Sequence, residues 1–150
     1  MVTEKFKRQA HVNAEPAKIF DWLTEPRHML EIWPSMVDET NVEVKPDGTH
    51  SFDWTYKMAG MKFQGHCDTI ELKRDRLRVD RNKSGIPSTF RWTFEPRDKG
   101  TDVTLEIEYE IPGKLLGHLA APIVRRLNER DGNTLVDNLK ERMEFAEAVA

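Results

Sequence analysis

Cysteine is almost absent from this chain of 150 residues, which contains Cys67 alone. A single cysteine excludes an internal disulfide and any zinc site built from several cysteines. Long apolar runs are also missing, because no stretch approaches the roughly 20 consecutive apolar residues that a membrane-spanning helix needs. We therefore expect no stable membrane insertion.

The net charge of the sequence is also small. The net charge is −3, so nothing in the overall balance favours nucleic acid or an anionic membrane as a partner. The N-terminal segment MVTEKFKRQAHV carries charges where a secretory signal peptide needs an apolar run. We expect a cytoplasmic protein with a single domain over residues 1–150, a length that can bury a proper core.

Catalytic and cofactor-binding signatures are missing as well. The sequence has no G-x-S-x-G, no H-E-x-x-H, no phosphate-binding glycine loop and no dinucleotide fingerprint. Its histidines show no metal-ligand spacing, and we interpret each as a surface or strand-edge residue. They are His11, His28, His50, His66 and His118. We therefore predict no metal and no cofactor, and we interpret Cys67 as a small buried apolar residue rather than a nucleophile.

What the sequence does contain is alternation between apolar and polar residues. Residues 3–12 alternate and predict a half-buried strand. Residues 16–24 then form an amphipathic pattern with Pro16 in the first helical turn, and Pro26 opens a second short helix that Pro34 ends. Six further strand signals follow, separated by turn residues, and they predict an antiparallel meander with one apolar face. A parity switch at Ile70 predicts a bulge in the fourth strand.

The segment from Pro112 onward has the pattern of a helix, and it is the only long element left to cover the apolar face of the sheet. The apolar stripe that contains Leu127 is rotated by roughly 100° from the stripe of Leu135 and Leu139, and Gly132 lies between them. We therefore predict a bend or break within residues 128–134.

The order of three local motifs is similar to a known family. The first is PAKIFDWLT at 16–24, followed by Trp33-Pro34. The second is WTFEP at 92–96, followed by GTDVT at 100–104. The third is Asn138-Leu139-Lys140. Together these motifs resemble the START-like (SRPBCC) superfamily of polyketide cyclase/dehydrase-like and lipid-transport-like proteins, nearly end to end.

This resemblance implies an α+β helix-grip fold. Its parts are a seven-stranded curved antiparallel sheet, two short helices after the first strand and a long C-terminal helix over the sheet. The resemblance also implies a cavity between the sheet and that helix, which in this family usually holds a lipid, sterol, polyketide or aromatic compound.

The aromatic residues of the expected inner face suit either a ligand pocket or a packed core, because both need the same side chains. Arg81 shares parity with Leu77 and Val79, which places it to meet an anionic head group. The residues that we predict to contact a ligand are Trp54, Tyr56, Met58, Met61, Phe63, Cys67, Arg81, Phe90, Trp92, Tyr109, Leu119, Ile123 and Leu127.

Three functions are compatible with the sequence. The one we favour is binding or carriage of a small hydrophobic molecule, without catalysis, because a catalytic constellation is missing. The second is an aromatase/cyclase-type enzyme acting on a polyketide-like substrate, with Tyr56, Tyr109 and Asp131 as the candidates for proton transfer. The third is an interaction module with a packed interior and no ligand.

Overall fold

The computed structural model describes residues 2–149 and contains strands and helices in the order that the sequence predicts. Within these residues the strands are β1 (Val2–Val12), β2 (Met36–Val44), β3 (His50–Met58), β4 (Met61–Lys73), β5 (Leu77–Asn82), β6 (Ser88–Arg97) and β7 (Gly100–Ile111). The helices are α1 (Pro16–Thr24), the short 3₁₀ helix η1 (Pro26–His28), α2 (Met29–Ile32), α3 (Gly113–Leu116) and α4 (Ala121–Ala148).

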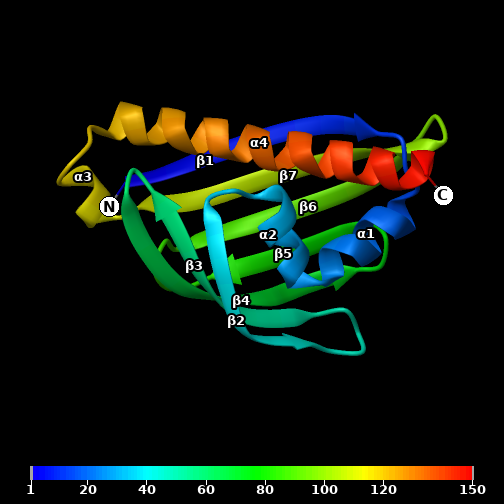
Figure 1. Ribbon diagram of the computed structural model, residues 1–150, viewed down its shortest axis with the longest axis horizontal. Helices are drawn as coiled ribbons and strands as arrows, with labels where there is room; N and C mark the ends of the chain where they lie inside the picture. The colour runs from blue at the N-terminus through cyan, green and yellow to red at the C-terminus, as the bar shows by residue number, and fades with distance from the viewer. Residues whose placement is uncertain (1, 150) are drawn as a thin grey trace.

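The seven strands of residues 2–149 form one antiparallel sheet in the order β1-β7-β6-β5-β4-β3-β2. β1 therefore pairs with the last strand, as in the register Phe6 opposite Ile107. Figure 1 shows α4 lying lengthwise over one part of the curved sheet, near β1 and β7, while α1 and α2 lie over another part. This arrangement confirms the helix-grip fold.

Strand alternation places the core between the sheet and the helices. On β3, Phe52, Trp54, Tyr56 and Met58 are all buried, whereas the residues between them are at least partly exposed. β4 has an irregular register between Thr69 and Glu71, which confirms the predicted bulge at Ile70. The bulge lets the first part of β4 turn Cys67 inward while Ile70 points to solvent.

The predicted break in the C-terminal helix is wrong. α4 runs without interruption from Ala121 to Ala148, and the helical segment is divided earlier, between α3 and α4. Gly132 has a different role, because a Cβ atom there would lie 2.7 Å from Cζ of Phe6. The glycine allows α4 to pack closely on β1, and the adjacent Leu135 and Leu139 are fully buried. No helix of residues 2–149 is long and apolar enough to cross a membrane.

Candidate functional site

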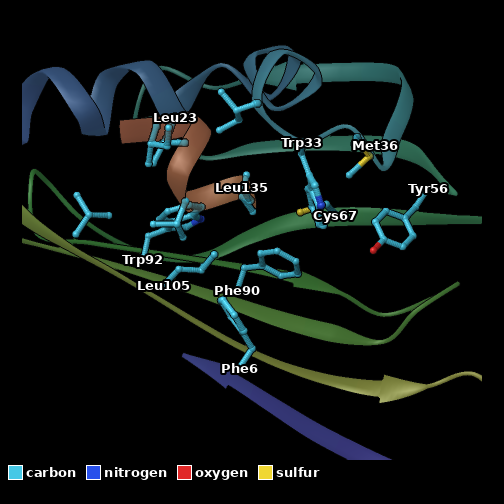
Figure 2. Close-up of a cluster of buried hydrophobic side chains, with 14 of the residues drawn as sticks. Phe6, Leu23, Trp33, Met36, Tyr56, Cys67, Phe90, Trp92, Leu105 and Leu135 are labelled. Atoms are coloured by element: carbon cyan, nitrogen blue, oxygen red, sulfur yellow. The ribbon is translucent and has the colours of Figure 1, made fainter. Parts of the chain in front are cut away.

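A cavity of about 100 Å³ lies between the sheet and the helices. Figure 2 shows side chains from both layers, including Trp33 and Phe90, meeting above the strands. The ring centroids of Trp33 lie 5.4 Å from those of both Tyr56 and Phe90. The aromatic lining residues are Phe6, Trp33, Phe52, Trp54, Tyr56, Phe90, Trp92 and Tyr109. The walls are thus mainly aromatic, with a few polar groups at defined places.

Asp131 of α4 is the centre of the first polar group. Its carboxylate accepts hydrogen bonds from Trp33 Nε1 at 2.5 Å, Ser35 Oγ at 2.6 Å and Tyr56 OH at 2.6 Å. Burial, together with the negative charge of Asp131, raises the pKa of the Tyr56 phenol well above its ordinary value. Tyr56 is therefore a neutral hydrogen-bond donor, and Asp131 connects α4 to the α2–β2 segment and to β3.

Arg78 of β5 is the centre of the second polar group and is only 1% exposed. Its Nη2 donates to the carbonyl oxygen of Gly48 at 2.6 Å and to Thr24 Oγ1 at 3.2 Å, and its Nη1 donates to Thr69 Oγ1 at 3.1 Å. Nη1 also lies 3.4 Å from Asp80 Oδ1. The buried Nε has no hydrogen-bond partner within residues 2–149. A buried guanidinium N–H thus remains available in a side chain that lines the cavity.

Asn82 makes the third polar contact on the cavity wall. Its Oδ1 accepts a hydrogen bond from Trp54 Nε1 at 2.8 Å, and its Nδ2 donates to Ser88 Oγ at 3.0 Å. These bonds fix the indole of Trp54 against β5 and β6. Gly65 and Gly85 pack on the same indole so closely that a Cβ at either position would lie less than 3 Å from it.

Three titratable groups near the interior have shifted pKa values. Burial lowers the pKa of His50, against the opposing effect of Asp80. Burial also raises the pKa of the Cys67 thiol well above its ordinary value, which keeps it protonated and weakly nucleophilic. On β2, burial raises the pKa of Glu39 to about 8, and neither carboxylate oxygen of Glu39 has a partner within residues 2–149.

The structure divides the residues predicted to contact a ligand into two groups. Six of them line the cavity: Trp54, Tyr56, Cys67, Phe90, Trp92 and Tyr109. Six lie outside it or at its margin: Met58, Met61, Phe63, Leu119, Ile123 and Leu127. Ile123 is 48% exposed, because the adjacent Val124 is the residue that α4 buries.

Arg81 is the remaining residue of that prediction, and its expected position is wrong. The parity of β5 is the reverse of the expected one, so Arg78, Asp80 and Asn82 line the cavity and Arg81 is exposed. Arg81 borders an outer polar groove instead. Leu77 and Val79 are buried as well, but they do not line the cavity, and the inner face of β5 is polar.

The three candidates for proton transfer also have defined positions. Tyr56 and Asp131 are brought into direct contact. Tyr109 lines the cavity separately, and burial raises its pKa, against the effect of a hydrogen bond with Asn128. The interpretation of His50 as a surface or strand-edge residue is wrong, because its side chain is buried. Sequence patterns contain no signal for Arg78 or Asp80 as interior residues, whereas His50 shares the inward parity of Phe52 and Trp54 on β3.

Comparison with solved structures supports the same fold. A protein of Thermus thermophilus aligns with a TM-score of 0.81 at 18% identity, over 95% of this chain and 99% of that one. The Zhui aromatase/cyclase from Streptomyces sp. R1128 aligns with a TM-score of 0.78 at 14% identity, over 95% of this chain and 94% of that one. A START superfamily protein from Mycobacterium smegmatis aligns with a TM-score of 0.78 at 13% identity, over 95% of this chain and 98% of that one.

A comparison with curated proteins found no match to the sequence of this chain. The family described as polyketide cyclase / dehydrase and lipid transport, however, matches residues 3–144, which is nearly the whole chain. This chain therefore belongs to the polyketide cyclase / dehydrase and lipid transport family.

Proposed function

We propose that this protein binds a small, mainly apolar molecule that carries one polar, electron-rich group. The observation that supports the proposal best is the position of Arg78. Its buried Nε lacks an acceptor within residues 2–149, and a buried N–H without a partner costs about 1–3 kcal/mol. A carbonyl or carboxylate oxygen in the cavity would supply that acceptor, while the aromatic walls would hold the apolar part.

The size of the cavity limits the ligand. At about 100 Å³ it is smaller than the roughly 150 Å³ engineered cavity that accepts a benzene molecule. A ligand larger than one ring must therefore displace side chains or part of the covering layer. The covering residues that line the cavity come from α1, from the segment Met29–Met36 and from α4, so we propose that one of these parts moves to admit a larger ligand.

Carriage agrees better with the polar contacts than catalysis does. Asp131 already accepts three hydrogen bonds, which leaves at most about one lone pair of its carboxylate for a ligand proton. Tyr56 donates its only proton to Asp131 and is therefore not free to protonate a ligand. Even so, the Tyr56–Asp131 contact favours an aromatase/cyclase-type reaction as the second candidate, because both residues line the cavity.

The proposal can be tested with the dye 8-anilinonaphthalene-1-sulfonate, which has an aromatic body and an anionic end. We expect one saturable dye site per chain, with enhanced dye emission and a heat of binding in calorimetry. The test variant is Ile86→Trp, a half-buried loop residue that lines the cavity. The matched control is Ile70→Trp, on an exposed residue that does not line the cavity.

Ile86→Trp should weaken dye binding at least tenfold, and Ile70→Trp should leave it unchanged. Arg78→Met should weaken binding of the anionic dye more than binding of uncharged naphthalene. Equal dye binding by both tryptophan variants would place the dye on the surface and refute the proposal. Absence of any saturable binding to the wild-type protein would refute it as well.

A further inference from the structure

Three possible metal ligands converge on the sheet side of the cavity, and this grouping does not depend on the proposed function. His50, Cys67 and Asp80 come from the adjacent strands β3, β4 and β5, and all three line the cavity. Their ligand atoms lie within 4.8 Å of one another. In a tetrahedral zinc site, bonds of about 2.0–2.3 Å place neighbouring ligand atoms about 3.3–3.7 Å apart.

The tautomer of His50 directs a lone pair toward this group. Nδ1 lies 2.8 Å from the carbonyl oxygen of Thr24, which can only accept, so Nδ1 carries the proton. The more distant Arg78 Nη1, at 3.4 Å, does not change this assignment. In the neutral ring Nε2 is then an acceptor, and it lies 3.5 Å from Asp80 Oδ1.

Two acceptors that face each other in a buried site repel unless a cation lies between them. A cation held between His50 Nε2 and Asp80 Oδ1 would remove this repulsion. Asp80 Oδ1 accepts a hydrogen bond from the neutral Thr69 hydroxyl at 2.8 Å, but Arg78 supplies a positive charge to it only at 3.4 Å, longer than the 2.7–2.9 Å of a strong charge-assisted bond. The partnership between His50 and Asp80 is therefore incomplete.

We propose that His50 Nε2, Cys67 Sγ and a carboxylate oxygen of Asp80 form a Zn²⁺ site whose fourth position faces the cavity. A hydrogen bond from Nδ1 to a backbone carbonyl is the usual support for a zinc-bound histidine. Three protein ligands with one open position is the arrangement of zinc sites that bind water or a ligand oxygen. Metal binding would displace the proton of the Cys67 thiol.

The charges of the site are compatible with the metal. Zn²⁺ together with Arg78, the Cys67 thiolate and the Asp80 carboxylate gives a net charge of about +1 by formal counting. Arg78 keeps its hydrogen bonds to Thr24 and to the carbonyl of Gly48, so it does not need Asp80 as its only partner. The remaining positive charge would favour an oxygen atom with negative character at the open position.

Cobalt(II) provides a direct test, because Cys67 is the only cysteine in the chain. Co²⁺ is titrated into chelator-treated full-length protein, followed by Zn²⁺. We expect one equivalent of Co²⁺ to produce a thiolate-to-cobalt charge-transfer band in the near ultraviolet together with intense tetrahedral bands in the visible, and Zn²⁺ to abolish both. Zn²⁺ should also raise the unfolding temperature of the wild-type protein.

The variants separate this site from adventitious binding. Cys67→Ala should lose the charge-transfer band, and His50→Ala and Asp80→Asn should each raise the apparent Kd for Co²⁺ at least tenfold. The matched control is His66→Ala, which removes an exposed histidine held by Asp53 and Asp68 and should leave the spectrum unchanged. Far-UV circular dichroism checks the folding of each variant.

The wild-type spectrum decides the question even where a variant does not fold. A spectrum without the charge-transfer band at millimolar Co²⁺ would overturn the proposal and leave a His50–Asp80 ion pair as the explanation of their proximity. A band that persists in Cys67→Ala would also overturn it, as would loss of the band in His66→Ala. None of these outcomes bears on dye binding in the cavity, so the two proposals fail separately.

Discussion

Replacement of Gly132 by alanine would test whether this glycine serves close packing between α4 and β1. A Cβ atom at position 132 would lie 2.7 Å from Cζ and 2.8 Å from Cε1 of Phe6, closer than real contacts. Overpacking of this kind costs about 1–3 kcal/mol. Alanine in place of glycine in a helix interior contributes about 1 kcal/mol in the opposite direction. We therefore expect Gly132→Ala to lower the free energy of unfolding by about 0–2 kcal/mol.

A double-mutant cycle isolates the packing effect from the helix propensity. In Phe6→Leu the ring tip that meets the new methyl group is absent, so the double variant should show a favourable coupling of about 1–3 kcal/mol. Because Phe6 also lines the cavity, the displaced ring in Gly132→Ala should weaken dye binding. The control is Gly113→Ala, where a Cβ meets nothing within 4 Å and stability should change by no more than about 0.5 kcal/mol.

Urea unfolding, followed by tryptophan fluorescence and circular dichroism, measures these differences. A gain of about 1 kcal/mol in Gly132→Ala with no coupling to Phe6 would refute the reasoning, since helix propensity alone would then account for the change. In that case the close approach of α4 to β1 would not depend on glycine.

Three further predictions concern polar groups that are buried or half-buried. Asp131→Asn removes the charge that accepts three hydrogen bonds and should cost about 2–3 kcal/mol in urea unfolding; a loss below about 0.5 kcal/mol would contradict this. Arg78→Met should cost about 3–5 kcal/mol, because it removes the bonds to Thr24, Gly48 and Thr69 and leaves the Asp80 charge without its cation; adding Asp80→Asn should restore part of this loss, and no recovery would count against the pairing. Folding raises the pKa of Glu39 from an ordinary 4.5 to about 8, so the folded state holds this proton more tightly and stability should fall as pH rises from 4.5 through 8. Glu39→Gln should therefore stabilise the protein by roughly 1–3 kcal/mol at pH 8.5 but not at pH 4, measured by urea unfolding at both values.

The fold could be predicted because alternation reports burial directly where one face of a strand is apolar. On β3 and β6 the residues expected inside, such as Trp54 and Trp92, are buried. The bulge at Ile70 also followed from parity alone. These patterns are local, and local patterns can be read from one sequence.

The polar part of the site could not be predicted in the same way. Arg78 is buried because Thr24, Gly48 and Thr69 supply acceptors from three other parts of the chain. Alternation treats a charged residue as exposed, so Leu77 and Val79 were expected on the inner face of β5 in place of Arg78 and Asp80. Arg81 shares the parity of Leu77 and Val79 and was therefore expected inside. Only the positions of those distant acceptors show that the charge can be buried.

The same limit explains the error in the C-terminal helix. A glycine in a helix interior indicates a weak point when only the helix is considered. The reason for Gly132 is the ring of Phe6, which lies near the opposite end of the chain. Contacts of this range are set by the packing of β1 beside β7 and cannot be seen in a helical pattern.

If the cavity holds a small apolar molecule, that molecule can be identified in protein taken from its natural source. Wild-type protein and the Ile86→Trp variant would be purified from the organism that makes the chain, and released small molecules would be measured by mass spectrometry. We expect one apolar compound with an oxygen-containing polar group, close to one per chain in the wild-type protein and at least tenfold depleted in the variant. The same amount of the compound in both proteins, or none in either, would contradict it.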